Sequence, residues 1–288
     1  MTFNNGDEIA SCIASLVNAA PSHLSEIFII DNASSDGTPF LVSKSRALNR
    51  FAKFKIIVNG ENKGFTAALN QGLALAKAPY VLFLNPDTIL QENAIVRMKK
   101  YLQKDRKIGV AAPLLRNEDG SIQPSCRRFP RHADVIFELT GLSRIFSKSA
   151  LFNRWKMGDF DHTKVRHVDQ PQGAFLMTRK SVVKKIGAWD EEFPMFFSDV
   201  DWCKRVTDAG FLILFTPEVQ ITHHKGRSVY ANRAAMIWSS HKSFIRYFSK
   251  HFSKPRWILP NALIAILLVF SGGLRYLAAQ LKSLFVGK

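Results

Sequence analysis

The sequence predicts an α/β fold in which helices alternate with the strands of a mostly parallel central sheet. Three short apolar runs, at residues 27–30, 55–58 and 80–84, each lead into a polar turn. Helix-like stretches separate these runs, and such alternation is typical of a doubly wound sheet. With 288 residues, the chain is long enough for this core and an appendage.

The run Tyr80-Val81-Leu82-Phe83-Leu84 organises this prediction. Five consecutive apolar residues predict a strand that is buried on both faces. The strand must end at Asn85-Pro86-Asp87 because proline has no N–H to donate to a neighbouring strand. Open α/β sheets bind ligands at the carboxyl ends of their strands, where a carboxylate can hold a divalent cation and, through it, a diphosphate. Taken alone, the same three residues are more often only a turn.

The elements before this strand follow the same pattern. A helix is predicted over about residues 8–18. The strand at 27–30 ends in the polar loop 31–38, which either caps a helix or lets Asp31 accept a hydrogen bond from a pyrimidine N–H. The strand at 55–58 leads to Gly64, where the backbone can approach a neighbour closely. A helix that begins beside Lys63 offers an anion site.

Charge and cysteine content limit the function classes. The formal charge is +17, and residues 219–288 contain eleven Lys and Arg but no Asp or Glu. Such asymmetry indicates an anionic partner, either nucleic acid or a membrane surface.

Cys12, Cys126 and Cys203 follow no metal-site spacing, so we expect buried, reduced thiols in the cytoplasm. We expect no signal peptide before the fold, and therefore a catalytic part that stays in the cytoplasm.

The C-terminal part predicts two further segments. Residues 231–256 form a basic amphipathic helix that either covers the core or lies on a membrane. Residues 258–274 carry no charge, but at about 1.5 Å per residue they reach only about 25 Å, short of a hydrocarbon core of about 30 Å. Pro260, Asn261 and Gly272-Gly273 weaken a clean span further. We therefore expect a domain over residues 1–230 and a membrane-associating tail over 257–288, with a full crossing left open.

Four motifs in order resemble those of family 2 glycosyltransferases. They are Thr2-Phe3-Asn4, the loop 31–38, Asn62-Lys63-Gly64-Phe65 and Leu84-Asn85-Pro86-Asp87. The closest similarity is to the bacterial rhamnosyltransferase-like branch, which has the GT-A nucleotide-sugar fold. This resemblance implies that the donor is bound by Thr2, Asn4, Asp31, Asn62, Gly64, Asn85 and Asp87.

The resemblance continues through residues 172–179 and 187–202 to about residue 255. Ser198-Asp199-Val200-Asp201 stands where the family usually has Glu-Asp-x-Asp, which implies that Asp199 is the general base and Asp201 a supporting group. Ser198 replaces the glutamate on the acceptor side, a difference that spares the base. The acceptor side would comprise Gly173, Asp201 and Trp202. The alternative is that Ser198 and Asp199 only cap a helix that runs to about residue 209.

The segment 223–228 resembles the family's His-x-x-Gly-x-Ser signature. By resemblance His223 would bind a metal together with Asp87, although His224 competes for this role. Mixed histidine and carboxylate ligation suits Mn²⁺ as well as Mg²⁺.

The family implies inverting transfer of a sugar from a nucleoside-diphosphate donor to a saccharide acceptor, lipid-linked, in cell-surface polysaccharide synthesis. The enzyme would lie on the cytoplasmic face of the bacterial inner membrane, peripheral or monotopic, and would bind no nucleic acid. Two alternatives are a catalytically inactive sugar-nucleotide-binding protein and a basic nucleic-acid-binding protein. The basic tail lacks a nucleic-acid-reading motif, and Asp199 argues against an inactive protein.

The resemblance also predicts a defect at the beginning of the sheet. It places residues 2–4 at the end of a central strand, yet only Met1 precedes them. About five buried aliphatic side chains, at about 1.5–3 kcal/mol each, would be lost with the body of that strand. We therefore expect either a start further upstream or a truncated, poorly active copy.

Overall fold

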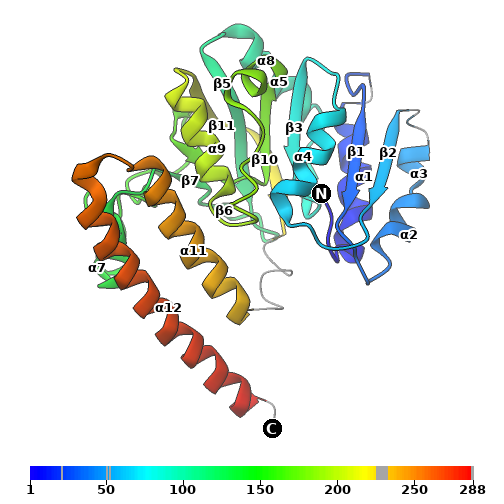
Figure 1. The fold of residues 1–288 in the computed structure, drawn as a ribbon. Helices are drawn as coiled ribbons and strands as arrows, with labels where there is room; N and C mark the ends of the chain where they lie inside the picture. The colour runs from blue at the N-terminus through cyan, green and yellow to red at the C-terminus, as the bar shows by residue number, and fades with distance from the viewer. Residues whose placement is uncertain (21, 50, 52, 225–232, 287–288) are drawn as a thin grey trace. The chain divides into compact units, whose positions relative to one another are not determined.

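The computed structural model of the chain describes residues 1–286 except 21, 50, 52 and 225–232 (Figure 1). The chain forms two compact units. The sheet unit comprises Met1–Arg127, Asp161–Pro194 and Ser198–Lys225, and the helical unit comprises Arg128–Phe160, Met195–Phe197 and Gly226–Lys288. Each unit is therefore assembled from separate stretches of sequence, whereas the sequence predicted three consecutive segments.

The sheet unit has the predicted alternation of strands and helices. Its elements are α1 (Gly6–Ala19), β1 (Ile27–Asp31), α2 (Thr38–Ser43), α3 (Arg46–Asn49), β2 (Phe54–Val58), α4 (Phe65–Leu75), β3 (Tyr80–Leu84), β4 (Thr88–Leu90), α5 (Ala94–Lys104), β5 (Ile108–Arg116), β6 (Ile122–Gln123), β7 (Cys126–Arg127), β8 (Arg166–His167), β9 (Gln170–Pro171), β10 (Phe175–Arg179), α8 (Lys180–Ile186), α9 (Ser198–Asp208) and β11 (Leu212–His223). The fold class is confirmed.

The main sheet is mixed in direction, which corrects the expectation of a mostly parallel one. Its strands lie in the order β3-β10-β5-β11-β4, and β6 and β8 pair at its side. β5 and β11 run parallel, but β10 is antiparallel to both β3 and β5, and β4 is antiparallel to β11. β1 and β2 form a separate parallel pair. The apolar composition of a strand indicates its burial but not its direction, so the sequence could not show this.

Helices cover both faces of β1. Ile27 and Ile29 pack in one apolar cluster with Ile9 and Ile13 of α1. On the other face, the Cα of Gly72 in α4 lies so close that an added Cβ would be 3.6 Å from Phe28 and from Ile30. β1 is therefore sandwiched between α1 and α4.

β3 is less buried than its composition predicts. Val81 and Phe83 are buried, but Tyr80, Leu82 and Leu84 are partly exposed. In contrast, all residues of β5 except the last are buried. In the described residues β3 pairs only with β10, so one of its edges has no neighbouring strand.

The helical unit contains α6 (His132–Leu139), α7 (Leu142–Ile145), α11 (Arg233–His251), η1 (Pro255–Trp257) and α12 (Ile258–Val286). α11 packs along α12, and its Tyr247 and Phe248 are fully buried. The two helices approach closely at Gly272, where an added Cβ would lie 3.2 Å from Trp238. The apolar face of α11 is therefore occupied within the protein, which favours core covering over membrane contact for this helix.

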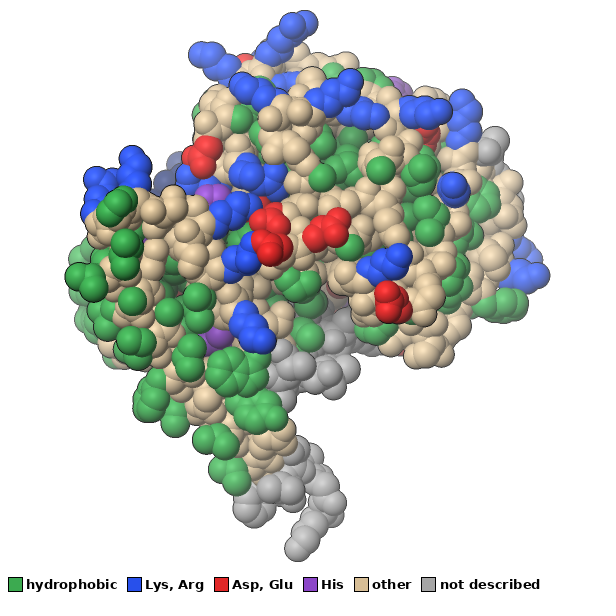
Figure 2. All heavy atoms as spheres, viewed as in Figure 1, with side chains coloured by type: hydrophobic (Ala, Val, Ile, Leu, Met, Phe, Trp, Pro, Cys, Tyr) green, Lys and Arg blue, Asp and Glu red, His purple; other side chains and the backbone are tan. Residues whose placement is uncertain are grey.

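α12 is one unbroken helix of 29 residues. Pro260 lies in its first turn, where the missing N–H costs nothing, and the helix continues through Gly272 and Gly273. Pro255–Leu281 is long and apolar enough to cross a membrane, by length and composition. Figure 2 shows apolar side chains along this helix. The exposed ones, together termed the apolar stripe, are Ile258, Leu259, Leu263, Ile266, Val269, Phe270, Leu274, Leu277 and Leu281.

The three cysteines are buried and unbridged, as expected. Burial raises the pKa of Cys12 to about 11 and that of Cys126 to about 12, so both thiols stay protonated at neutral pH.

Candidate active site

The end of β11 lies beside the turn that follows β3. β4 pairs with β11 so that Thr88 lies opposite His223, and the N–H of His224 donates to the carbonyl of Asp87 at 2.8 Å. Two residues more than a hundred positions apart in the sequence are thereby fixed next to each other. The predicted pair Asp87 and His223 is brought together by this register.

The facing atoms of this pair are of the types that could hold a cation. His223 Nε2 lies 3.5 Å from Asp87 Oδ1. Among the described residues, Asp87 Oδ1 is buried and has no hydrogen-bond partner. A buried carboxylate oxygen without a partner is costly. A divalent cation bonded to both atoms would remove this cost.

Gln123 determines which ring nitrogen of His223 donates a hydrogen bond. Its Nε2 donates to Asn117 Oδ1 at 2.9 Å and to the His223 carbonyl at 3.3 Å, so its Oε1 is the acceptor that faces His223 Nδ1 at 2.7 Å. Nδ1 therefore carries a proton, and in the neutral imidazole the lone pair belongs to Nε2, the atom that faces Asp87. A carboxylate oxygen and a nitrogen lone pair repel each other unless a cation lies between them.

The protein alone offers few metal ligands. No group of three or more His, Cys, Asp or Glu side chains in the described ranges could hold a metal ion. His224, which the sequence offered as an alternative metal ligand, instead forms a hydrogen bond with Glu118 through Nδ1 at 2.6 Å. Lys225 to Ser228 of the predicted signature lie outside the described residues. A cation at Asp87 and His223 would need its remaining ligands from substrate and water.

Asp31 ends β1 and is almost completely buried. Its Oδ1 accepts hydrogen bonds from Thr2 Oγ1 at 2.9 Å and Ser34 Oγ at 2.6 Å, and its Oδ2 accepts one from the N–H of Ser34 at 2.9 Å. A carboxylate can accept about four hydrogen bonds, so within the part of the chain that the structure describes one position on Oδ2 stays open. Asn4 braces the same loop, because its Oδ1 accepts from the N–H of Ser35 at 2.9 Å.

A network of amide side chains shapes the loop before α4. Asn32 donates to Asn62 Oδ1 at 2.7 Å and accepts from Asn59 at 3.1 Å, while Asn59 and Gln71 exchange two hydrogen bonds of 3.0 Å. Asn62 Oδ1 also accepts from the N–H of Gly64. The sequence predicted Asn62 but not the other three, because they become partners only when β1, β2 and α4 are packed together.

Gly64 permits the close approach that the sequence predicted, and its neighbour is Pro194. Its φ of +86° is strained for other residues, and an added Cβ would lie 3.3 Å from Pro194.

Asn85 connects β3 to β10, since its N–H donates to the Ala174 carbonyl at 2.9 Å. The carbonyl of Asn85 accepts from Thr88 Oγ1 at 2.8 Å and closes the turn that presents Asp87.

Asp199 is held at the start of α9 by three donors. Its Oδ2 accepts from the N–H of Gly173 at 3.0 Å and from Gln170 at 2.9 Å, and its Oδ1 accepts from the N–H of Val200 at 2.9 Å. Burial raises the pKa of this carboxyl, and the three hydrogen bonds only partly oppose that effect. Among the described residues no further donor fills the remaining acceptor position on Oδ1, which is left for another proton donor. Gln170, which the sequence analysis missed, lies on β9, about thirty residues away.

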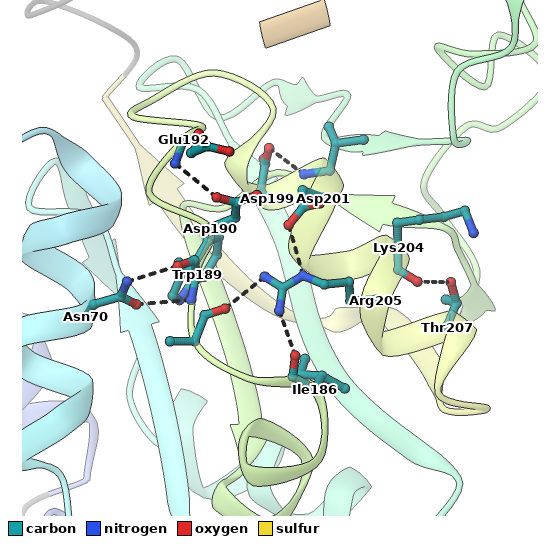
Figure 3. Close-up of polar contacts among 12 residues, drawn as sticks. Asn70, Ile186, Trp189, Asp190, Glu192, Asp199, Asp201, Lys204, Arg205 and Thr207 are labelled. Atoms are coloured by element: carbon teal, nitrogen blue, oxygen red, sulfur yellow. Dashed lines mark hydrogen bonds and ion pairs between the residues drawn. The ribbon is translucent and has the colours of Figure 1, made fainter. Parts of the chain in front are cut away.

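Asp201 and Trp202 lie behind the site, because both side chains are completely buried. Figure 3 shows Asp201 bound to Arg205, with Oδ2 accepting from Nε at 2.9 Å. Arg205 also donates to the carbonyls of Ile186 and Ala188 at 2.7 and 2.8 Å. Trp202 stacks on Trp189 with ring centroids 5.1 Å apart. Neither side chain offers a surface to an acceptor, so both act as supports.

α4 is tied to the segment that precedes α9. Asn70 accepts from the N–H of Trp189 at 3.0 Å and donates to its carbonyl at 2.9 Å (Figure 3). In this contact the Asn70 amide forms two hydrogen bonds with the backbone of one residue, as a paired residue in a β-sheet does. It connects the helix after the 59–64 loop with the residues that lead to Asp199.

Comparison with known proteins gives one consistent result. Residues 1–187 match the model of "Glycosyl transferase family 2". The chain is 26% identical to the N-acetylglucosaminyl-diphospho-decaprenol L-rhamnosyltransferase of Mycobacterium tuberculosis over 91% of this chain and 88% of that protein. It is 27% identical to the rhamnosyltransferase WbbL of Escherichia coli over 59% of this chain and 62% of that protein.

Solved structures show the same fold. The mannosyltransferase PcManGT from Pyrobaculum calidifontis, in complex with GDP-Man and Mn²⁺, superimposes with a TM-score of 0.57 over 96% of this chain and 72% of that chain, at 16% identity. The TarS protein of Staphylococcus aureus superimposes with a TM-score of 0.53 over 88% of this chain and 42% of that chain, at 15% identity. The family match covers more than half of this chain, and the fold agrees. The protein therefore belongs to glycosyltransferase family 2, with the GT-A fold and with rhamnosyltransferases among its relatives.

Proposed function

We propose that this protein transfers a sugar with inversion from a nucleoside-diphosphate donor to a hydroxyl of a lipid-linked saccharide. The observation that carries the proposal is Asp199, a carboxylate fixed by three donors, with a raised pKa and one open acceptor position. The similarity to the mycobacterial enzyme favours a rhamnose donor and an acceptor carried on a polyprenyl diphosphate.

Asp199 would act as the general base. Its Oδ1 takes the proton of the acceptor hydroxyl while the acceptor oxygen forms a bond to the anomeric carbon. The bond from that carbon to the diphosphate oxygen breaks, and the diphosphate leaves with the electron pair. Such base catalysis contributes about 10²–10⁴ in rate.

The state of the second carboxylate near the start of this helix supports inversion. Asp201, the nearest acidic residue in the sequence, is buried and bound to Arg205. It cannot reach the anomeric carbon to form a covalent intermediate. We infer a single displacement by the acceptor, which inverts the anomeric configuration.

The donor would bind at the ends of β1 and β3. Asp31 would accept a base N–H on its open position, while Thr2, Asn4, Asn62, Gly64 and Asn85 fix the loops around it. Asp87 Oδ1 and His223 Nε2 would hold Mn²⁺ or Mg²⁺. When bound, such a cation neutralises the charge that develops on the leaving diphosphate.

The apolar stripe of α12 would attach the protein to the cytoplasmic face of the bacterial inner membrane. Leu259 and Phe270, for example, are 82% and 68% exposed. The opposite side of α12 packs inside the protein, where Ile264 and Leu268 are buried. A helix with one apolar side free and the other packed suits the plane of the membrane interface. The eleven Lys and Arg of residues 219–288 would meet anionic headgroups.

The test combines stereochemistry with one substitution. Purified protein is incubated with a nucleoside-diphosphate rhamnose, Mn²⁺ and an N-acetylglucosaminyl-diphospho-polyprenol, and the anomeric configuration of the product is read by NMR. Asp199→Asn should lower turnover at least about 10²-fold while donor binding stays unchanged. Asp208→Asn is the control, because this residue lies on the same helix with a 53% exposed side chain. Retention of configuration, or normal turnover by the Asp199 variant, would contradict the proposal.

A further inference from the structure

The segment that follows α6 exposes three large apolar side chains. Ile145 and Leu151 are 72% and 61% exposed, and Phe146 is 47% exposed. We term these three residues the α7 patch, because α7 ends at Ile145 and the other two lie in the turns that follow it. Single exposed apolar residues are ordinary on a protein surface, whereas three of them within seven residues indicate an interaction surface.

The segment that carries the α7 patch is held by its own hydrogen bonds. Ser149 Oγ accepts from the N–H groups of Leu151 and Phe152, both at 3.2 Å, and the Ser149 N–H donates to the Phe146 carbonyl at 3.0 Å. The ring of Phe152 contacts those of Phe137 and Phe146, with centroids 5.1 and 5.0 Å away. Phe152 thus occupies the contact with α6, and the α7 patch is presented in one fixed arrangement outside it.

α6 connects the α7 patch to the helix that carries the apolar stripe. It packs against both α7 and α12. At its start, His132 Nε2 lies 2.8 Å from Asn261 Oδ1 of α12, and the His132 ring stacks on Trp257 with centroids 5.0 Å apart. The α7 patch and the apolar stripe therefore belong to one packed unit.

The charge of the helical unit fits an anionic partner. The unit contains sixteen Lys and Arg but only three Asp and Glu. Each of these three carboxylates forms an ion pair inside the unit: Asp134 with Arg154, Glu138 with Lys156 and Asp159 with Arg128. Beside the α7 patch, Arg144 and Lys148 are exposed, and residues 139–158 contain no Asp or Glu. Two such units repel each other, so a second copy of the chain is a poor occupant of the patch.

We propose that the α7 patch is a second membrane contact, which enters the interface of an anionic leaflet while Arg144 and Lys148 meet its headgroups. Nucleic acid would pair with these cations but would leave the aliphatic side chains of the patch in water, whereas a membrane interface accommodates both. The inference rests on the proposed membrane attachment and adds a separate element to it. The apolar stripe provides most of the affinity, and the patch increases it because both belong to one unit.

Lipid binding in the absence of sugar substrates tests this contact separately from catalysis. The full chain is mixed with vesicles of phosphatidylcholine and phosphatidylglycerol in equal amounts, and the bound fraction is measured by sedimentation. Ile145→Ser combined with Leu151→Ser should lower the partition coefficient at least about tenfold, because two large apolar side chains no longer leave water. Phe146 is kept because its ring contacts Phe152. The control is Phe40→Ser on α2 of the sheet unit, where Phe40 is 64% exposed.

Unchanged partitioning of the double variant, or an equal loss in the control, would overturn the proposal. Circular dichroism should show the same Tm for the double variant and the original chain, because both substituted side chains are mostly exposed. A large fall in Tm would overturn the assignment of these side chains to a free surface.

A fluorescent label locates the contact directly. The three native cysteines are buried, so the thiol introduced by Ile145→Cys is the accessible one and can carry nitrobenzoxadiazole, whose emission rises in apolar surroundings. The vesicles should raise the emission of this label severalfold and leave that of a label introduced by Phe40→Cys unchanged. No rise at position 145, an equal rise at both positions, or a rise caused by unlabelled protein without vesicles would each overturn the proposal. If the apolar stripe alone attaches the protein, vesicles still bind it without a rise at position 145, which separates failure of the patch from failure of membrane attachment.

Discussion

Replacement of Arg205 by alanine tests whether the buried pair behind the site supports it. Asp201 is completely buried, and the side chain of Arg205 is 21% exposed. The substitution leaves the carboxylate inside the protein without its guanidinium. It also removes the donors to the carbonyls of Ile186 and Ala188.

The expected loss of stability is large. Removing one partner of a buried ion pair typically costs about 3–5 kcal/mol, because the remaining charge keeps its desolvation penalty. For a protein of this size, 1 kcal/mol corresponds to about 2–4 °C in Tm, so Arg205→Ala should lower Tm by about 6–20 °C. Thermal unfolding followed by circular dichroism measures this shift.

The neighbouring residue provides a matched control. Lys204 forms an ion pair with Asp208 on the same helix and at the same spacing, but the Asp208 side chain is 53% exposed. Such exposed pairs contribute about 0.3–0.5 kcal/mol, so Lys204→Ala should change Tm by no more than about 2 °C. The double substitution Asp201→Leu with Arg205→Met removes both charges and should recover part of the loss. Equal effects of Arg205→Ala and Lys204→Ala would refute the reasoning.

Three further predictions concern the base, the metal and the membrane. Gln170→Ala removes a donor to the ionised form of Asp199, so the pKa of the base rises further and the acid limb of the kcat/KM profile moves to higher pH; an unmoved limb would show that Asp199 is not the titrating group. His223→Ala and Asp87→Ala should each weaken Mn²⁺-dependent donor binding at least about tenfold by calorimetry, with Mn²⁺-independent binding unchanged; equal losses with and without Mn²⁺ would contradict a metal role. Replacing Leu259, Leu263 and Phe270 of the apolar stripe by serine should abolish flotation with anionic vesicles, and unchanged flotation would place the anchor elsewhere.

The raised pKa of Asp199 also makes the stability of the protein depend on pH. The folded-state pKa of Asp199 lies above its ordinary value because of burial, so ionisation of this group disfavours the folded state. Its destabilising effect is absent below the ordinary pKa of an aspartic acid and develops as pH rises through the folded-state value. Asp199→Asn should therefore gain stability relative to the original chain as pH increases through this window, in denaturant titrations at several pH values.

The sequence determined the elements and the positions of the acidic residues at strand ends. Apolar runs bounded by polar turns located β1, β2 and β3, because a buried strand needs continuous apolar side chains and a turn needs residues that leave the ladder. The order of short motifs was sufficient for the family, and Asp87, His223 and Asp199 were all predicted. These are local features or fixed spacings, which a linear sequence records.

Only the tertiary structure decided which side chains meet and which are unsupported. Asn32, Asn59, Gln71, Gln123 and Gln170 are ordinary amides in the sequence, and they gain their roles from partners on other elements. The direction of β10 and the burial of Asp201 likewise depend on packing between segments that are far apart in the chain. Local composition fixes how a segment folds, but a hydrogen-bond partner, an ion pair and a missing neighbour are properties of pairs of segments, and their geometry exists only after the chain has folded.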